Sequence, residues 1–252
     1  MTLTDKEQEA RKRVCLALDV RDVNEALNLS GELSDYVGTF KVGKQLHTVA
    51  CNQGVPILKE IYSRGGSTFL DLKLHDTPNT AYETAYASVV DGVYVFNVHV
   101  AGGEEMCKKA VQGAEDGAGF TQIERPKVIG VTALTSLSDE DLEEQGLGIS
   151  YDDLVRRRTE LARNWGLDGI VCPANKAGDL EKEFGSDFIY VTPGIKWAGK
   201  QGAGQKQLYT PDRAVQDCSN SILVVGSAIT KAENRRETAY EILKAMAPNM
   251  SV

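Results

Sequence analysis

Eight short apolar segments recur along the chain, and a stretch with helical spacing separates most of them from the next. They are rich in β-branched residues and apolar throughout, as expected for strands that are buried on both faces of a parallel sheet. The segments cover residues 14–20, 39–43, 68–73, 93–100, 127–134, 169–173, 188–192 and 222–226. Eight strand–helix units in one chain are typical of a closed (β/α)8 barrel. We therefore predict an α/β fold, a single TIM barrel, with residues 1–252 forming one domain.

Helices are predicted between the strands where apolar residues recur at intervals of three and four. The clearest lie at residues 23–33, 81–90, 105–114, 154–165 and 235–246. A doubly wound open sheet is the alternative fold. It is disfavoured because eight units exceed its usual number of strands and because no GxGxxG motif follows the first strand.

Composition restricts the partners of this chain. A net charge of -8 disfavours nucleic acid and anionic membranes, because both repel an acidic surface. No apolar run approaches the roughly 20 residues that cross a bilayer, and the first residues, MTLTDKEQEARKR, lack the apolar core of a signal peptide. The five cysteines contain no CxxC pair, which favours reduced structural thiols. We predict a cytoplasmic protein that acts on a small molecule, with no nucleic-acid or membrane partner.

Charged residues gather where the predicted strands end. Asp19 closes the first strand, Lys41 lies in the second, Asp71 and Lys73 close the third, and His99 ends the fourth. Active sites of TIM barrels lie at these carboxyl ends. Residues two apart on a strand point to the same side, so Asp71 and Lys73 are expected to face the barrel together, with Lys41 as the balancing charge. A purely structural ion-pair network is the alternative interpretation, and the clustering at the catalytic end disfavours it.

The run Asp71-x-Lys73-x-x-Asp76, in the setting FLDLKLHDTPNTA, resembles the signature of the orotidine 5′-monophosphate decarboxylase family. Further blocks match that family in order, from about residue 14 to 246: LALDV, FKVGK, NVHVAGG, VTALTS, VTPGI and VVGSAIT. The resemblance implies a carbon–carbon lyase of pyrimidine biosynthesis that converts orotidine 5′-monophosphate to UMP without a cofactor. It also implies a homodimer with shared active sites.

The resemblance assigns roles to individual residues. Lys73 is similar to the general acid that protonates C6 after carbon dioxide leaves, and Asp71 to the carboxylate beside the substrate carboxylate. Lys41 and Asp19 resemble the contacts to the ribose hydroxyls, with Lys41 also holding Asp71. Asp76, Thr77 and Thr80 resemble the part of the site that comes from the other subunit, and Ser136 the pyrimidine contact.

The residue types suit this chemistry. Loss of the carboxylate leaves a carbanion in the plane of the ring, with no π system to accept the electrons. No cofactor motif and no metal-ligand spacing is present, so preorganised charges are the expected means of stabilisation. An ammonium near C6 stabilises the carbanion and delivers the proton, and lysines alternating with aspartates stay charged despite burial.

Two positions depart from the family pattern. Ala198 stands where the family carries glutamine, and Ser227 where it carries arginine. Both family residues hold the 5′-phosphate of the substrate. Three interpretations remain open: an engineered variant with a weakened phosphate grip, a natural relative whose substrate lacks that phosphate or carries another group, or replacement of the contacts by Lys196, Lys200 or Lys206.

The irregular stretch 193–207 follows the seventh strand and carries four glycines, and phosphate sites of barrels gather there. Backbone amides near Pro193, Gly194 and Gly226 are therefore expected to bind an anion.

Two other functions are alternatives. A sister branch, which includes keto-gulonate-phosphate decarboxylase and hexulose-phosphate synthase, uses a divalent metal, but HDTPNT and FKVGK favour the nucleotide branch. A non-catalytic binding protein is disfavoured by the intact Asp71, Lys73 and Asp76.

Overall fold

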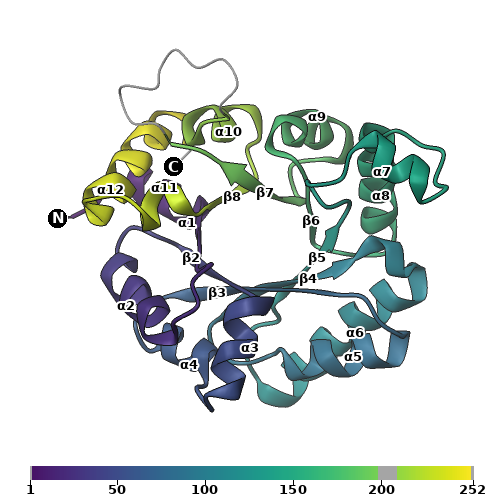
Figure 1. The fold of residues 1–252 in the computed structure, drawn as a ribbon, viewed down its shortest axis with the longest axis horizontal. Helices are drawn as coiled ribbons and strands as arrows, with labels where there is room; N and C mark the ends of the chain where they lie inside the picture. The colour runs from purple at the N-terminus through teal and green to yellow at the C-terminus, as the bar shows by residue number, and fades with distance from the viewer. Residues whose placement is uncertain (1, 198–208, 251–252) are drawn as a thin grey trace.

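The computed structural model describes residues 2–197 and 209–250, which form a closed barrel of eight parallel strands. Each strand pairs with the next along the chain, and β8 pairs with β1 to close the sheet. Figure 1 shows the strands as an inner ring with the helices around it. The predicted TIM barrel is therefore confirmed. The strands are β1 (Val14–Ala17), β2 (Thr39–Gly43), β3 (Ser67–Leu74), β4 (Val93–His99), β5 (Lys127–Val131), β6 (Gly169–Val171), β7 (Ile189–Ile195) and β8 (Ser221–Val225).

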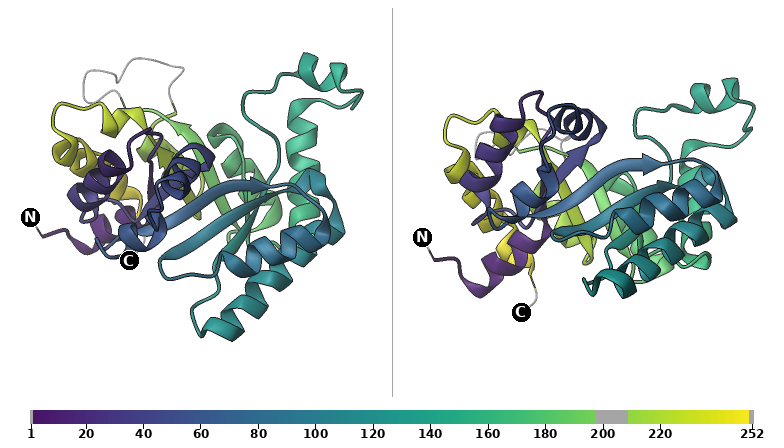
Figure 2. Two further views of the ribbon diagram at one scale, coloured as in Figure 1. Left: turned by 60° about the horizontal axis from the view of Figure 1, so that its bottom comes forward. Right: turned by 90° about the horizontal axis from the view of Figure 1, so that it is seen from below.

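The helices follow the strands on the outside of the barrel, and α1 precedes β1. They are α1 (Asp5–Arg13), α2 (Val23–Leu33), α3 (Lys44–Asn52), α4 (Ile57–Tyr62), α5 (Pro78–Ala87), α6 (Glu104–Thr121), α7 (Asp139–Glu144), α8 (Tyr151–Asn164), α9 (Ala174–Phe184), α10 (Pro211–Asp217), α11 (Ser227–Thr230) and α12 (Arg235–Met246), with 3-10 turns η1 (Val100–Gly102) and η3 (Ala247–Asn249). Figure 2 shows α7 standing away from the barrel, at the end opposite to the two chain termini. Within the described residues, no helix combines the length and the apolar character needed to span a bilayer.

Helix starts depend on capping residues that apolar spacing does not mark. The predictions for α2 and α12 agree with the structure. Helices α5 and α8 begin three residues earlier than predicted, after Thr77 and Ser150 respectively. Each of these side chains accepts a hydrogen bond from a backbone N–H of the first turn. Such a cap stabilises the first turn before the buried face of the helix begins.

Several strand ends differ from the prediction by one or two residues, and the three largest differences, of three residues each, lie at the carboxyl end of the barrel. Strand β1 stops at Ala17, so Asp19 lies beyond it, and β5 stops at Val131. Strand β7 instead runs on to Ile195 through Pro193 and Gly194, which were predicted to lie in a loop. The pairing with β8 shifts register between Thr192 and Ile195, and Gly194 takes a φ of 82°. This bulge lets the strand pass a residue that has no N–H to donate.

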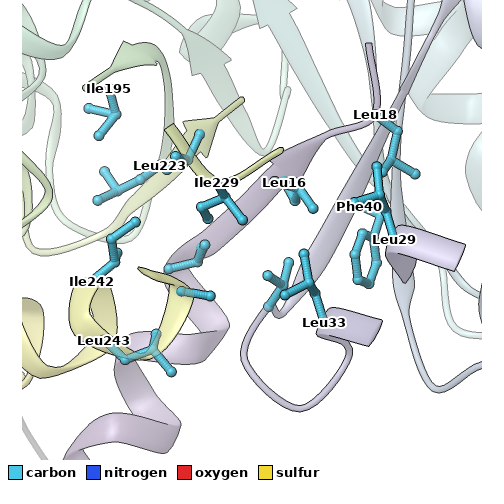
Figure 3. Close-up of a cluster of buried hydrophobic side chains, with 14 of the residues drawn as sticks. Leu16, Leu18, Leu29, Leu33, Phe40, Ile195, Leu223, Ile229, Ile242 and Leu243 are labelled. Atoms are coloured by element: carbon cyan, nitrogen blue, oxygen red, sulfur yellow. The ribbon is translucent and has the colours of Figure 1, made fainter. Parts of the chain in front are cut away.

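The core has two layers, because successive residues of each strand point to opposite sides. The interior of the barrel is filled by apolar side chains, mostly small or β-branched, that include Ala17, Phe69, Val95, Ile129 and Val224. Between the strands and the helices lie larger clusters. Figure 3 shows one of them, where leucines and isoleucines of β1, β8, α2 and α12 form one cluster with Phe40 of β2, which lies beside Leu18 and Leu29. Each fully buried side chain of this kind stabilises the fold by about 1.5–3 kcal/mol.

Candidate active site

Four charged side chains of alternating sign form a chain across the mouth of the barrel. The Lys41 Nζ lies 2.9 Å from Asp19 Oδ1 and 3.4 Å from Asp71 Oδ2. The Lys73 Nζ lies 2.6 Å from Asp71 Oδ1. The side chains of Lys41 and Asp71 are only 12% and 11% exposed, whereas that of Asp19 is 68% exposed. The predicted cluster is therefore brought together, with its buried centre at Lys41 and Asp71.

This cluster lines a cavity of about 420 Å³. Strand alternation places the charges there, because Phe40 and Val42 on β2 and Leu70 on β3 pack outward against the helices. Lys41 and Asp71 consequently point inward. The floor of the cavity is apolar and includes Phe69 and other residues of the barrel interior; its full lining also contains Ala17, Val131, Ala133, Val171, Val191, Ile195 and Val224.

Mutual attraction keeps the two buried partners ionised. Burial disfavours the charged form of Lys41, but the negative charges of Asp71 and Asp19 outweigh it and raise the pKa of Lys41. Burial likewise disfavours the Asp71 carboxylate. The charge of Lys41, the hydrogen bond and charge of Lys73, and the hydrogen bond from Asn97 together lower the pKa of Asp71. The Asp71 carboxylate and the Lys41 ammonium therefore stay charged although both side chains are largely buried, in surroundings where electrostatic effects are stronger than in water.

Lys73 occupies an unusual backbone conformation, with a φ of 51°. The left-handed region costs a residue with a side chain roughly 1–2 kcal/mol. The strain lies within β3 where its pairing with β4 shifts register. Such strain persists only where the surrounding contacts hold it in place.

Asn97 belongs to this arrangement and was missed in the sequence. Its Nδ2 donates to Asp71 Oδ1 at 2.7 Å, and its Oδ1 accepts from the Lys73 backbone N–H at 2.7 Å. It is 0% exposed. A usable signal was present: Asn97 alternates with Val95 on the inward face of a strand that is otherwise mostly apolar, and a buried amide requires partners.

The opposite wall of the cavity is formed by the ends of β7 and β8. Pro193, Gly194, Gly226 and Ser227 line it together, as does Lys196. The structure thus brings together four predicted substrate-binding residues and one of the lysines considered as a replacement for the phosphate contacts. Ala198, Lys200 and Lys206 lie outside the described residues.

The remaining predicted residues do not line this cavity in the described part of the chain. Asp76, Thr77 and Thr80 lie exposed at the link between β3 and α5, where Asp76 Oδ1 accepts from the Thr77 N–H at 2.7 Å. Ser136 is also exposed. In its place Leu134 and Thr135, from the same segment, line the cavity, and sequence reasoning did not single them out.

A pair of histidines lies next to the charged chain. The rings of His75 and His99 are 5.3 Å apart. Burial, followed by the positive charges of His75, Lys44 and Lys73, lowers the pKa of His99 to about 4. His99 is therefore neutral at physiological pH. In the described residues, no three His, Cys, Asp or Glu side chains gather in a way that would hold a metal ion.

Comparison with known proteins identifies the family. Residues 12–242 match the Orotidine 5'-phosphate decarboxylase / HUMPS family. A relative from Heliobacterium modesticaldum named orotidine 5'-phosphate decarboxylase is 39% identical over 96% of this chain and 99% of its own length. A second, of the same name, from Aliivibrio fischeri is 38% identical over 94% of this chain and 97% of its own length.

Solved structures agree with this match. The crystal structure of orotidine 5'-phosphate decarboxylase from Lactobacillus acidophilus has a TM-score of 0.77 and 33% identity, covering 92% of this chain and 98% of that one. An uncharacterized conserved protein from Geobacillus kaustophilus has a TM-score of 0.78 and 29% identity, covering 92% of this chain and 99% of that one. Both the sequence and the fold therefore place this chain in the orotidine 5'-phosphate decarboxylase / HUMPS family.

Proposed function

We propose that this protein decarboxylates orotidine 5′-monophosphate to UMP and that its own side chains suffice for the reaction. The observation that carries the proposal is the buried Asp71 carboxylate held between two ammonium groups, with Lys73 at 2.6 Å and Lys41 at 3.4 Å. Two family relatives that share 38–39% of their residues with this chain bear the name of that activity. An arrangement of fixed charges suits a reaction whose difficulty is an unstabilised carbanion.

In the proposed reaction, the pyrimidine enters the cavity with its carboxylate beside Asp71. The bond from C6 to the carboxylate carbon breaks, carbon dioxide leaves, and the electron pair stays on C6. The Lys73 ammonium stabilises that carbanion and transfers its proton to C6, which forms a new C–H bond. Lys73 is then neutral and takes up a proton from solvent before the next turnover. Asp71 and Lys41 hold the ammonium in position throughout.

The rest of the substrate fits the other walls of the cavity. Asp19 and Lys41, joined by a 2.9 Å hydrogen bond, are proposed to contact the ribose hydroxyls. The 5′-phosphate is proposed to lie against Pro193, Gly194, Gly226 and Ser227. Lys196 lines the same wall and is the described lysine that would supply its positive charge. Ser136 and the position of Ala198 stay proposals from the family resemblance.

We further propose a cytoplasmic homodimer, with residues 1–252 as one domain, in which each subunit completes its neighbour's site. Exposure of Asp76, Thr77 and Thr80 supports this assembly, because these residues are free to reach a second subunit. Among the described residues that line the cavity of the same subunit, these three do not appear. The free cysteines and the negative net charge support the proposed compartment.

A direct assay tests the activity. Purified protein is incubated with orotidine 5′-monophosphate or with orotidine, and loss of the orotate absorbance is followed together with release of carbon dioxide. We expect turnover of the nucleotide, and the ratio of kcat/KM for the two substrates measures the contribution of the phosphate. Absence of product from both substrates, in folded protein with Lys73 intact, would show that the proposed activity is wrong.

A further inference from the structure

Strand β3 is irregular where it carries the charged pair. Leu70 pairs with Phe96 of β4, and Leu74 pairs with Val98. Residues 71–73 of β3 therefore face the single residue Asn97 of β4. Such a bulge leaves backbone groups without their usual partners in the neighbouring strand. The Lys73 N–H is one of these groups, and it lies where the backbone turns to a φ of 51°.

Asn97 closes a ring of contacts around this bulge. Its Oδ1 accepts from the Lys73 N–H, and its Nδ2 donates to Asp71 Oδ1, both at 2.7 Å. The Lys73 Nζ contacts the same Asp71 oxygen at 2.6 Å. The orientation of the amide is determined by its partners, since a backbone N–H only donates and a carboxylate only accepts. One side chain thus ties both the backbone and the charged head of Lys73 to Asp71.

We propose that Asn97 is a positioning residue for the reaction: it holds Lys73 in its left-handed conformation and directs the ammonium toward Asp71 and the reacting carbon. The inference rests on the proposed function. Asn97 is 0% exposed and is absent from the described residues that line the cavity, so it acts through Asp71 and Lys73 and not by touching the substrate. A side chain at this position must accept on one arm and donate on the other. Leucine can do neither, and an ionised aspartate can only accept.

Asn97→Leu keeps the branching of the side chain and removes both hydrogen bonds. We expect kcat for orotidine 5′-monophosphate to fall by about 10²-fold or more, because a displaced proton donor weakens transition-state stabilisation. KM and the Kd of UMP should change by less than about threefold, since the substitution leaves the proposed ribose and phosphate contacts in place. A crystal structure of the variant should show Lys73 outside the left-handed region or its Nζ detached from Asp71.

Asn97→Asp separates positioning from simple loss of packing. The new carboxylate still accepts from the Lys73 N–H but repels Asp71, so kcat should be low at pH 8. Residue 97 faces Asp71 and Lys73, which belong to β3. On its own strand, β4, His99 lies two residues further along, and the partner of residue 97 on β5 is the apolar Ile129. As pH falls, one proton shared by the two carboxylates restores a donor to Asp71. The ratio of variant to wild-type kcat should therefore rise severalfold between pH 8 and pH 5.5.

Val98→Ala is the matched control. Val98 is the next residue of β4, is 0% exposed and packs outward among the helices. It should lower the thermal midpoint of the protein while leaving kcat and its pH profile near those of the wild type. A similar fall in kcat for Val98→Ala and Asn97→Leu would show that any damage to β4 suffices, and the inference would be wrong.

The outcomes separate this inference from the proposed function. If the wild type decarboxylates the nucleotide and folded Asn97→Leu matches its kcat within about threefold, the activity stands and the positioning role is overturned. If the wild type has no activity on the nucleotide, the proposed function fails, and the crystal structure of Asn97→Leu decides the inference alone. An unchanged Lys73 φ and an unchanged contact between Lys73 and Asp71 would then overturn it.

Discussion

Lys41 and Lys73 bind opposite oxygens of one carboxylate: Lys41 lies 3.4 Å from Asp71 Oδ2, and Lys73 lies 2.6 Å from Asp71 Oδ1. Removal of one lysine therefore leaves Asp71 paired with the other. Breaking a buried ion pair completely costs about 3–5 kcal/mol of stability, and this shared arrangement avoids that cost. The two lysines can thus be examined separately in folded protein.

Lys73→Ala should abolish decarboxylation without unfolding the protein. A positioned general acid contributes about 10²–10⁴-fold to rate, and Lys73 additionally supplies the charge nearest the proposed carbanion. We expect kcat to fall by at least about 10³-fold, measured from carbon dioxide release, with an unchanged circular dichroism spectrum. Turnover near the wild-type rate would rule out Lys73 as the proton donor.

His99 should make stability depend on pH between about 4 and 6.5. The folded-state pKa is lowered to about 4, so the unfolded chain takes up a proton in this window and the folded chain does not. The free energy of unfolding should therefore fall as pH drops from 6.5 to 4, by about 1–2 kcal/mol after allowance for solvent screening at a partly exposed ring. Above pH 6.5 the contribution of His99 is constant.

Urea denaturation at pH 7 and pH 4.5 measures this effect, with His99→Gln as the comparison. The variant should lose less stability over the interval than the wild type. Carboxylates titrate alike in both proteins and cancel in the difference. Equal losses in the two proteins would contradict the assignment to His99.

Shared active sites should be detectable by mixing two inactive variants. Lys73→Ala and Asp76→Ala are each expected to be inactive as pure dimers. In a hybrid dimer, one site combines the intact Lys73 of one chain with the intact Asp76 of the other. Equal mixtures should regain about one quarter of the wild-type activity, because half of the dimers are hybrids with one native site each. Native mass spectrometry verifies that the subunits have exchanged. If no activity returns in the exchanged mixture, the result counts against sites shared between subunits.

Ser227→Arg should strengthen binding of the phosphate. Ser227 is exposed at the cavity wall, so a longer side chain has room there. A charge-assisted hydrogen bond contributes about 1.5–3 kcal/mol, which predicts a rise of about 10- to 150-fold in kcat/KM for the nucleotide. The value for orotidine should change little, which is the internal control. Lys196→Ala in the wild-type background should lower kcat/KM for the nucleotide alone if Lys196 holds the phosphate; unchanged kinetics in both variants would place the phosphate elsewhere.

Chelation distinguishes the nucleotide branch of the family from the metal-dependent sugar-phosphate branch. Dialysis against EDTA should leave decarboxylation of the nucleotide unaltered, because the proposed reaction uses only ammonium and carboxylate groups. Added Mg²⁺ serves as the second arm of the same assay. Activity that disappears on chelation and returns with Mg²⁺ would assign the protein to the sugar-phosphate branch.

Much of the site could be predicted from residue order alone. The alternation of apolar strands and amphipathic helices determines a barrel, and a barrel brings the carboxyl ends of its strands to one mouth. Asp19, Lys41, Asp71 and Lys73 each lie within two residues of such an end or within the last residues of the strand, so their meeting follows from topology. The family motifs then predict the chemistry, and this prediction requires no distances between side chains.

Only the tertiary structure decided which residues complete that cluster and how. The bulge in β3, the left-handed Lys73 and the amide of Asn97 form one arrangement, and it depends on the register between two strands. The register between two strands cannot be predicted from local sequence, because packing across the whole sheet determines that register. The same reason explains Pro193 and Gly194, a sequence typical of a turn that the pairing of β7 with β8 retains inside a strand.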